Sequence, residues 1–150
     1  MRVKEFKRER TIYDVFYQTS DGELFAKKED AERHEKTYEC VIKTMFKKIP
    51  HSTTNPYSWM DYGNDYDCIY VMRPRDLNDI KIINEYWMYI NCDTSHSILD
   101  SSTIGKPILL MEGECHDWLQ YLGTVENYTK SITEHINMKI EEMGDKTNAE

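Results

Sequence analysis

The sequence lacks any long apolar run, and its cysteines do not form a paired motif. Apolar runs such as Ile108–Met111 are far shorter than the roughly 20 residues that a membrane-spanning helix needs. The N-terminus, MRVKEFKRER, carries charges where a signal peptide has an apolar segment. Cys40, Cys68, Cys92 and Cys115 lie far apart without a CxxC pair, which favours reduced thiols. We therefore expect a soluble cytoplasmic protein with no membrane partner.

Basic residues are missing from a long central stretch, because no Lys or Arg occurs between Ile49 and Met72. Residues 1–48 hold 12 Lys and Arg against 10 Asp and Glu, whereas residues 49–150 hold 7 against 17. The whole chain has a net charge of -8. An acidic surface repels nucleic-acid and membrane phosphates and attracts basic partners, so we expect no direct nucleic-acid binding. Simple solubility explains the same charge, and that alternative stays open.

No catalytic or metal-binding motif in the sequence is complete. The phosphate-loop pattern that ends at Gly105-Lys106 fails, because Asp100 stands in place of its first glycine. The zinc-protease pattern that begins at His34 fails, because Tyr38 stands in place of its second histidine. The sequence therefore favours a binding protein over an enzyme, and we expect no cofactor.

One set of soft and borderline metal ligands remains as an alternative. Cys92, His96, Cys115 and His116 could supply four zinc ligands if their two loops meet, because zinc favours tetrahedral sulfur and nitrogen sites. A thiol hydrolase built on Cys115 and His96 is a second possibility, although neither lies in a nucleophile motif. The third interpretation packs Cys68 and Cys92 as small apolar side chains and leaves His96 and His116 exposed in loops.

The order of predicted elements is β-β-α-β-α-β-α, which indicates an α+β domain with a small, mainly antiparallel sheet covered by about three helices. We expect one domain over residues 1–143 and a disordered tail over residues 144–150. A hairpin is predicted over 11–17 and 23–26, and residues 50–67 are loop-like. Strands are predicted over 68–72 and 107–111, and helices over 28–48, 76–91 and from Thr124 to Gly144.

The apolar spacing within the three predicted helices indicates which of their side chains face the core. The helix over 76–91 has a second apolar stripe, made of Ile82, Tyr86 and Tyr89, which fits either a sandwiched core helix or an oligomer interface. In the helix over 28–48, Cys40 falls opposite the apolar face, so we expect it to be exposed. The last helix carries one apolar face, formed by Val125, Tyr128, Ile132, Ile136, Ile140 and Met143.

The opening segment combines an aspartate–glycine turn, a phenylalanine, an acidic helix start and a His-Glu pair. These are Asp21-Gly22, Phe25, Glu29–Ala31 and His34-Glu35. The combination, over about residues 11–38, resembles small accessory proteins of bacteriophages and prophages. That resemblance implies a scaffold without catalytic content, a place in the host cytoplasm, and an anti-defence role such as anti-CRISPR activity.

The stretch Asn55–Asp67, NPYSWMDYGNDYD, combines aromatic and acidic residues without a basic side chain. Three interpretations compete: a lid over the sheet, an outward-facing binding loop, or part of a ligand pocket. Tyr and Trp give large contact areas at little entropic cost, which is typical of binding loops. The candidate partner-binding residues are Tyr57, Trp59, Asp61, Tyr62, Asp65, Tyr66, Asp67, Glu112 and Glu114.

Together these observations predict a small acidic protein that binds and inhibits a host nucleic-acid-handling or defence protein. Its carboxylates would face the basic, nucleic-acid-binding surface of that host protein. A small zinc-dependent or thiol-dependent enzyme and a structural homo-oligomer, in its simplest form a homodimer, stay open as alternatives.

Overall fold

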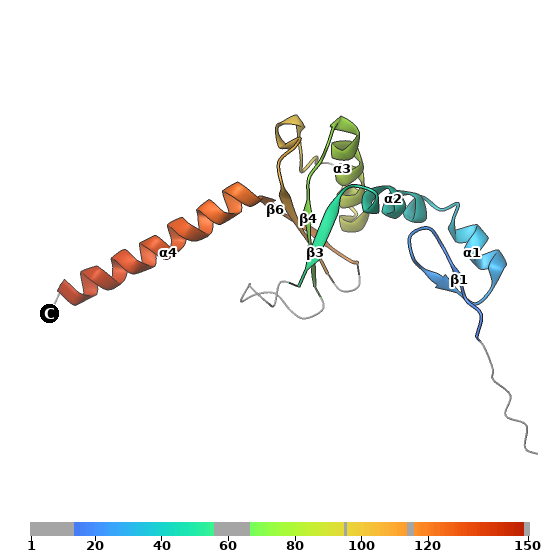
Figure 1. The fold of residues 1–150 in the computed structure, drawn as a ribbon, viewed down its shortest axis with the longest axis horizontal. Coiled ribbons are helices and arrows are strands. Elements are labelled where there is room, and N and C mark those ends of the chain that lie inside the picture. Colours follow the sequence, from blue (N-terminus) through green and yellow to red (C-terminus); the bar gives the residue numbers. More distant parts are fainter. Residues whose placement is uncertain (1–13, 56–66, 95, 114–115, 149–150) are drawn as a thin grey trace, which may run out of the picture.

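The computed structural model describes residues 14–55, 67–94, 96–113 and 116–148, and of residues 145–148 only the backbone (Figure 1). Within these ranges the chain forms an α+β fold, which confirms the predicted class. Its elements are β1 (Tyr17–Gln18), β2 (Leu24–Phe25), α1 (Lys28–His34), α2 (Tyr38–Lys47), β3 (His51–Thr54), β4 (Cys68–Met72), α3 (Leu77–Asn91), η2 (Ser101–Thr103), β5 (Ile108–Glu112), β6 (Leu119–Thr124) and α4 (Val125–Asn148).

The main sheet has the strand order β3-β4-β5-β6, and every neighbouring pair is antiparallel. β5 lies in the middle, with Leu110 opposite Tyr70 on one side and Tyr121 on the other. The pairing of β5 with β6 shifts register between Leu109 and Leu110, which is a β-bulge. β1 and β2 form a separate two-stranded hairpin.

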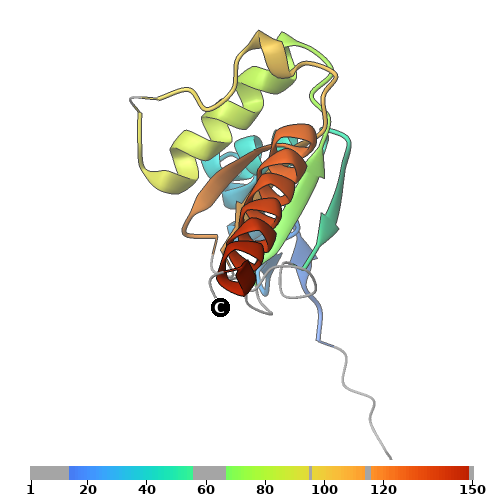
Figure 2. The same ribbon diagram turned by 90° about the vertical axis from the view of Figure 1, so that its left-hand side faces the viewer.

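The two faces of the main sheet are covered differently. α2 and α3 pack on one face, where Phe46 stacks on Tyr86 with ring centroids 4.1 Å apart and meets Tyr70 edge-on at 5.2 Å. A smaller apolar cluster around Ile69 lies on the opposite face. Figures 1 and 2 show α4 starting at that opposite face and running away from the sheet. The core of the protein therefore lies between the sheet and α2 and α3.

The structure corrects the predicted helix over residues 28–48, which is two helices. Thr37 separates them, because its extended backbone ends the first and its Oγ1 caps α2 by accepting a hydrogen bond from the Cys40 amide at 3.2 Å. Cys40 is only 1% exposed, so the prediction that it faces solvent is wrong. Periodicity alone missed the break, since the two helices keep a similar apolar spacing on either side of it.

Several other boundaries also differ from the prediction. β3 lies in the stretch predicted to be a loop, and β6 was not predicted. β1 begins only at Tyr17, while residues 11–13 lie outside the described part of the chain. α4 continues past Gly144 to Asn148, so the predicted helix end at Gly144 is wrong. Among the described residues, no helix combines the length and the apolar character that crossing a membrane requires.

Candidate functional site

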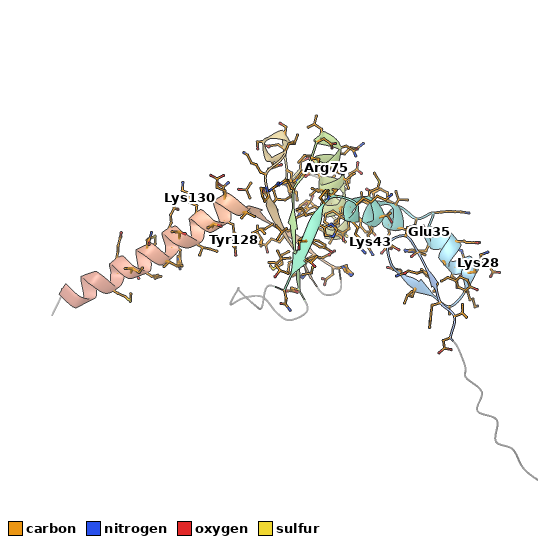
Figure 3. The ribbon with its side chains drawn as sticks, in the orientation of Figure 1. Lys28, Glu35, Lys43, Arg75, Tyr128 and Lys130 are labelled. Atoms are coloured by element: carbon orange, nitrogen blue, oxygen red, sulfur yellow. The ribbon has the colours of Figure 1, made fainter. Side chains whose placement is uncertain are left out.

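Among the residues that the structure describes, the contacts of α4 with the body are made by its first turn. The Val125 amide donates to the Pro107 carbonyl at 2.9 Å, and Thr124 Oγ1 accepts the Asn127 amide at 3.1 Å as a helix cap. Val125 and Tyr128 pack against the small cluster around Ile69, and Figure 3 shows Tyr128 at the end of α4 nearest the sheet. From residue 129 to residue 144 every side chain is exposed. Most of α4 thus projects into solvent.

The projecting part of α4 carries a row of exposed apolar side chains. Ile132, Ile136, Ile140 and Met143 lie on one side of the helix, spaced four, four and three residues apart. Their exposed fractions are 43%, 51%, 54% and 61%. We call these four residues the α4 stripe. Single exposed apolar side chains are common on soluble proteins, but a continuous exposed row marks a surface that binds something.

Charged side chains elsewhere on α4 form ion pairs within the helix, and Met138, on the side opposite the stripe, is also exposed, at 54%. Lys130 lies 3.9 Å from Glu134, and Lys139 lies 3.2 Å from Glu142. Such exposed pairs contribute little to stability, but they keep the helix hydrated on those sides. α4 is therefore amphipathic, and chemically it offers an apolar row to another helix or to a groove.

A second noteworthy group surrounds Glu112, the last residue of β5. Its carboxylate is 1% exposed and accepts hydrogen bonds from the hydroxyl groups of Tyr70, at 2.6 Å, and Tyr86. His116 Nδ1 lies 3.2 Å from the same carboxylate. Burial, together with the negative charge of Glu112, raises the pKa of both tyrosines. Their hydroxyl groups therefore stay protonated and donate hydrogen bonds to Glu112. These contacts satisfy the buried charge and join β4, α3 and the end of β5.

This geometry corrects the predicted role of Glu112. We expected it to present a carboxylate to a basic partner, but the structure encloses it in the core beneath His116. His116 itself is exposed and adopts a positive φ of 53° in the turn after β5. A glycine would adopt that conformation at lower cost than histidine does.

The predicted zinc ligands are only partly brought together. Cys92 and His116 line the same open hollow of about 370 Å³, next to the ion pair of Lys43 with Glu39. His96 lies instead beside Asp93, at 3.3 Å, and Cys115 lies outside the described residues. Zinc binding and thiol catalysis at these residues stay predictions.

One other group within the described residues could hold a metal ion: Asp21, His34 and Cys40 place three ligand atoms within 4.8 Å of one another. Asp21 comes from the turn between β1 and β2, His34 from the end of α1 and Cys40 from α2. Each ligand already has a partner, because Asp21 and His34 are 2.8 Å apart and the Cys40 thiol points to Glu35 at 3.7 Å. We therefore interpret the group as a polar lock that holds the hairpin on the helices.

Further hydrogen bonds complete this polar lock. Thr19 donates to Asp21 at 2.6 Å, and the Ser20 hydroxyl and amide both donate to Glu35, with the amide at 2.7 Å. Burial opposes ionisation of Asp21, but the hydrogen bonds from Thr19 and His34 outweigh it and hold its pKa far below the ordinary value. The hydrogen bond to Asp21 likewise raises the pKa of His34. Both shifts favour an ion pair between Asp21 and His34.

The polar lock gives a structural reason for the residues that carry the resemblance in the opening segment. Asp21, His34 and Glu35 make its main contacts, the Phe25 ring lies 5.1 Å from the His34 ring, and Ala31 is buried. All five hold the hairpin against α1.

The remaining predicted site residues fall into two groups. The aromatic and acidic residues proposed for partner binding lie outside the described residues, apart from Asp67, which is half-buried just before β4. Those outside are Tyr57, Trp59, Asp61, Tyr62, Asp65, Tyr66 and Glu114. Of the second apolar stripe on α3, Ile82 and Tyr86 are 6% and 2% exposed, which confirms the core interpretation for them and excludes them from an oligomer interface. Tyr89 is half-buried and packs edge-on against Tyr38 at 5.7 Å.

The sequence named the residues of the α4 stripe but not their exposure. Helical spacing shows which side chains share a face, and it carries no information about what covers that face. The Glu112 group was missed because Tyr70 and Tyr86 lie 42 and 26 residues away from it in the chain.

No protein-family model, curated protein or solved structure matches this chain. The function must therefore be argued from the geometry of its own residues.

Proposed function

We propose that this protein works by binding another protein chain, and that α4 makes the contact. The observation that carries the proposal is the α4 stripe, which projects from the body with its four side chains 43–61% exposed. A helix of this kind is stabilised mainly by packing of its apolar face, so it gains order and burial when a partner covers it.

The energy available at the stripe suits such a contact. Full burial of one Ile or Met side chain contributes about 1.5–3 kcal/mol, so a half-exposed one contributes on the order of 1 kcal/mol when it is covered. Four such side chains together give a useful but modest contribution, part of which offsets the entropy lost on association. The contact should therefore be reversible.

A protein partner fits the stripe better than a lipid surface. Helices that lie on membranes are rich in Lys and Arg on their polar side, whereas the polar side of α4 includes Glu134, Glu141 and Glu142. The whole chain has a net charge of -8 and is repelled by anionic lipid.

Inhibition of a host protein is the more specific form of this proposal, and it rests on the resemblance to phage accessory proteins. In that form α4 anchors the complex through apolar contacts, while the acidic segment around residues 57–67 adds charge-dependent contacts to a basic surface. The two contributions differ in their response to salt, which makes them separable by experiment.

The test is an affinity capture with purified protein as bait, using as prey both a differently tagged second copy and a bacterial lysate. Three baits are compared: the wild type, Ile136→Glu in the α4 stripe, and Asn137→Glu on the neighbouring polar side of α4. The proposal expects a prey that the wild type and Asn137→Glu retain and that Ile136→Glu loses. Equal capture by all three baits would show that α4 makes no contact.

A further inference from the structure

We infer that the α4 stripe pairs with the α4 stripe of a second copy of this chain, with the two helices antiparallel and crossing at Ile136. The inference rests on the proposed function and names the partner. Ile132 and Ile140 lie four residues before and after Ile136. A two-fold axis at Ile136 therefore places Ile132 of each helix opposite Ile140 of the other, so one stripe complements itself.

The shape and charge of the molecule favour the antiparallel arrangement. α4 extends away from the body in Figure 1, and its 24 residues span about 36 Å. An antiparallel pair places the two globular bodies at opposite ends of the helix pair. A parallel pair would bring them together, although each chain has a net charge of -8.

The flanks of the stripe allow close approach without burying an unpaired charge. Lys139, the charged residue nearest the stripe, already pairs with Glu142 on its own helix at 3.2 Å, and its aliphatic stem can cover the edge of the contact. Two paired stripes bury on the order of 1,000 Å² in total, which is at the low end for specific complexes. The dimer should therefore be weak, with a dissociation constant in the micromolar range or above.

Sedimentation equilibrium of the full chain over a wide range of concentrations tests the inference. The wild type should move from a mass of 17.9 kDa toward twice that value as concentration rises. Ile136→Glu should remain a monomer, because it places two charges at the two-fold axis. Asn137→Glu, the adjacent polar-side control, should dimerise like the wild type.

Spin labels carried by a non-natural residue at position 127 or 137 test the direction of pairing while keeping the native cysteines. In the antiparallel pair, the labels at 137 lie close together, and those at 127 are separated along the axis by about 27 Å. In a parallel pair, the two separations would be equal and short, which would overturn the arrangement.

Two results of the sedimentation experiment would overturn the inference in different ways. If the wild type stays a monomer at every concentration but captures a different protein through the α4 stripe, the dimer is refuted. The proposed function is then still supported. If Ile136→Glu dimerises as well as the wild type, the second copy binds elsewhere on the protein. If the same variant also captures its prey as well as the wild type does, the proposed function of α4 is refuted too.

Discussion

The two ends of the molecule are held by different forces. At one end the hairpin and α1 are fixed by polar contacts, chiefly the 2.8 Å pair of Asp21 with His34 and the hydrogen bonds from Ser20 to Glu35. At the other end α4 has an apolar stripe and almost no contact with the body beyond its first turn. Glu35 and Lys130, labelled in Figure 3, lie at these opposite ends.

The difference separates an end that is held by contacts within the chain from an end whose apolar side chains are exposed. Hydrogen bonds and buried ion pairs demand specific geometry, so the polar lock defines a contact within one chain. Apolar side chains need only to be covered, and beyond the first turn of α4 they are exposed up to residue 144. The hairpin is thus held by contacts within its own chain, whereas we propose that a partner covers the projecting part of α4.

The largest expected effect is the loss of the polar lock in Asp21→Ala. The variant removes the buried carboxylate that Thr19 and His34 share and leaves both with only their weaker contacts to Glu23, which should lower the local stability of the hairpin by about 2–4 kcal/mol. Hydrogen exchange at the Thr19 and Gly22 amides, which close the turn, measures the change. Asp14→Ala, at an exposed position, should leave this exchange unaltered, and equal rates in the two variants would refute the lock.

The polar lock also predicts how stability depends on pH. The lowered pKa of Asp21 contributes stability above its ordinary value of 3.8, and this is lost as pH falls below that value. The raised pKa of His34 contributes stability that is complete below 6.5 and is lost as pH rises through the raised pKa. The stability advantage of the wild type over His34→Gln should therefore peak between these values and shrink in alkaline solution. Urea unfolding across the pH range measures it, and a flat difference would be evidence against the ion pair.

These two predictions concern residues whose contacts sequence analysis could not place. Strand 68–72 and the helix over 76–91 were predicted nearly as the structure has them, because strong local patterns define them. Glu112 was placed on the surface because it follows the apolar run of β5, and its burial depends on Tyr70 and Tyr86, which are distant in sequence. β3 was missed because HSTT lacks an apolar pattern and is an edge strand held by β4 alone.

A smaller effect should come from the glycine inside α4. A Cβ added at Gly144 would meet nothing within 4 Å, so Gly144→Ala should stabilise the helix by about 0.5–1 kcal/mol through backbone entropy alone. Gly123, which precedes α4 with a φ of +113°, is equally uncrowded but conformationally strained for alanine. Gly123→Ala should therefore destabilise the protein. Thermal unfolding followed by circular dichroism compares the two, and equal shifts would contradict this interpretation.

The smallest expected effect is that of salt on association through α4. Apolar contacts respond weakly to ionic strength, so raising salt from about 0.05 to 0.5 M should leave the dissociation constant nearly unchanged or slightly lower it. A contact made by the acidic residues around 57–67 would weaken strongly over the same range. Sedimentation or calorimetry at several salt concentrations distinguishes the two contacts, and strong weakening would shift the binding surface away from α4.

The most direct measurement is amide hydrogen exchange of α4 at several protein concentrations. If the projecting part of α4 depends on a second chain for coverage, amides 130–144 should exchange rapidly in dilute protein and slowly in concentrated protein. The amides of Thr19 and Gly22, in the locked hairpin, should exchange at the same rate throughout. Protection of α4 that does not change with concentration would contradict the claim that this helix is completed by assembly.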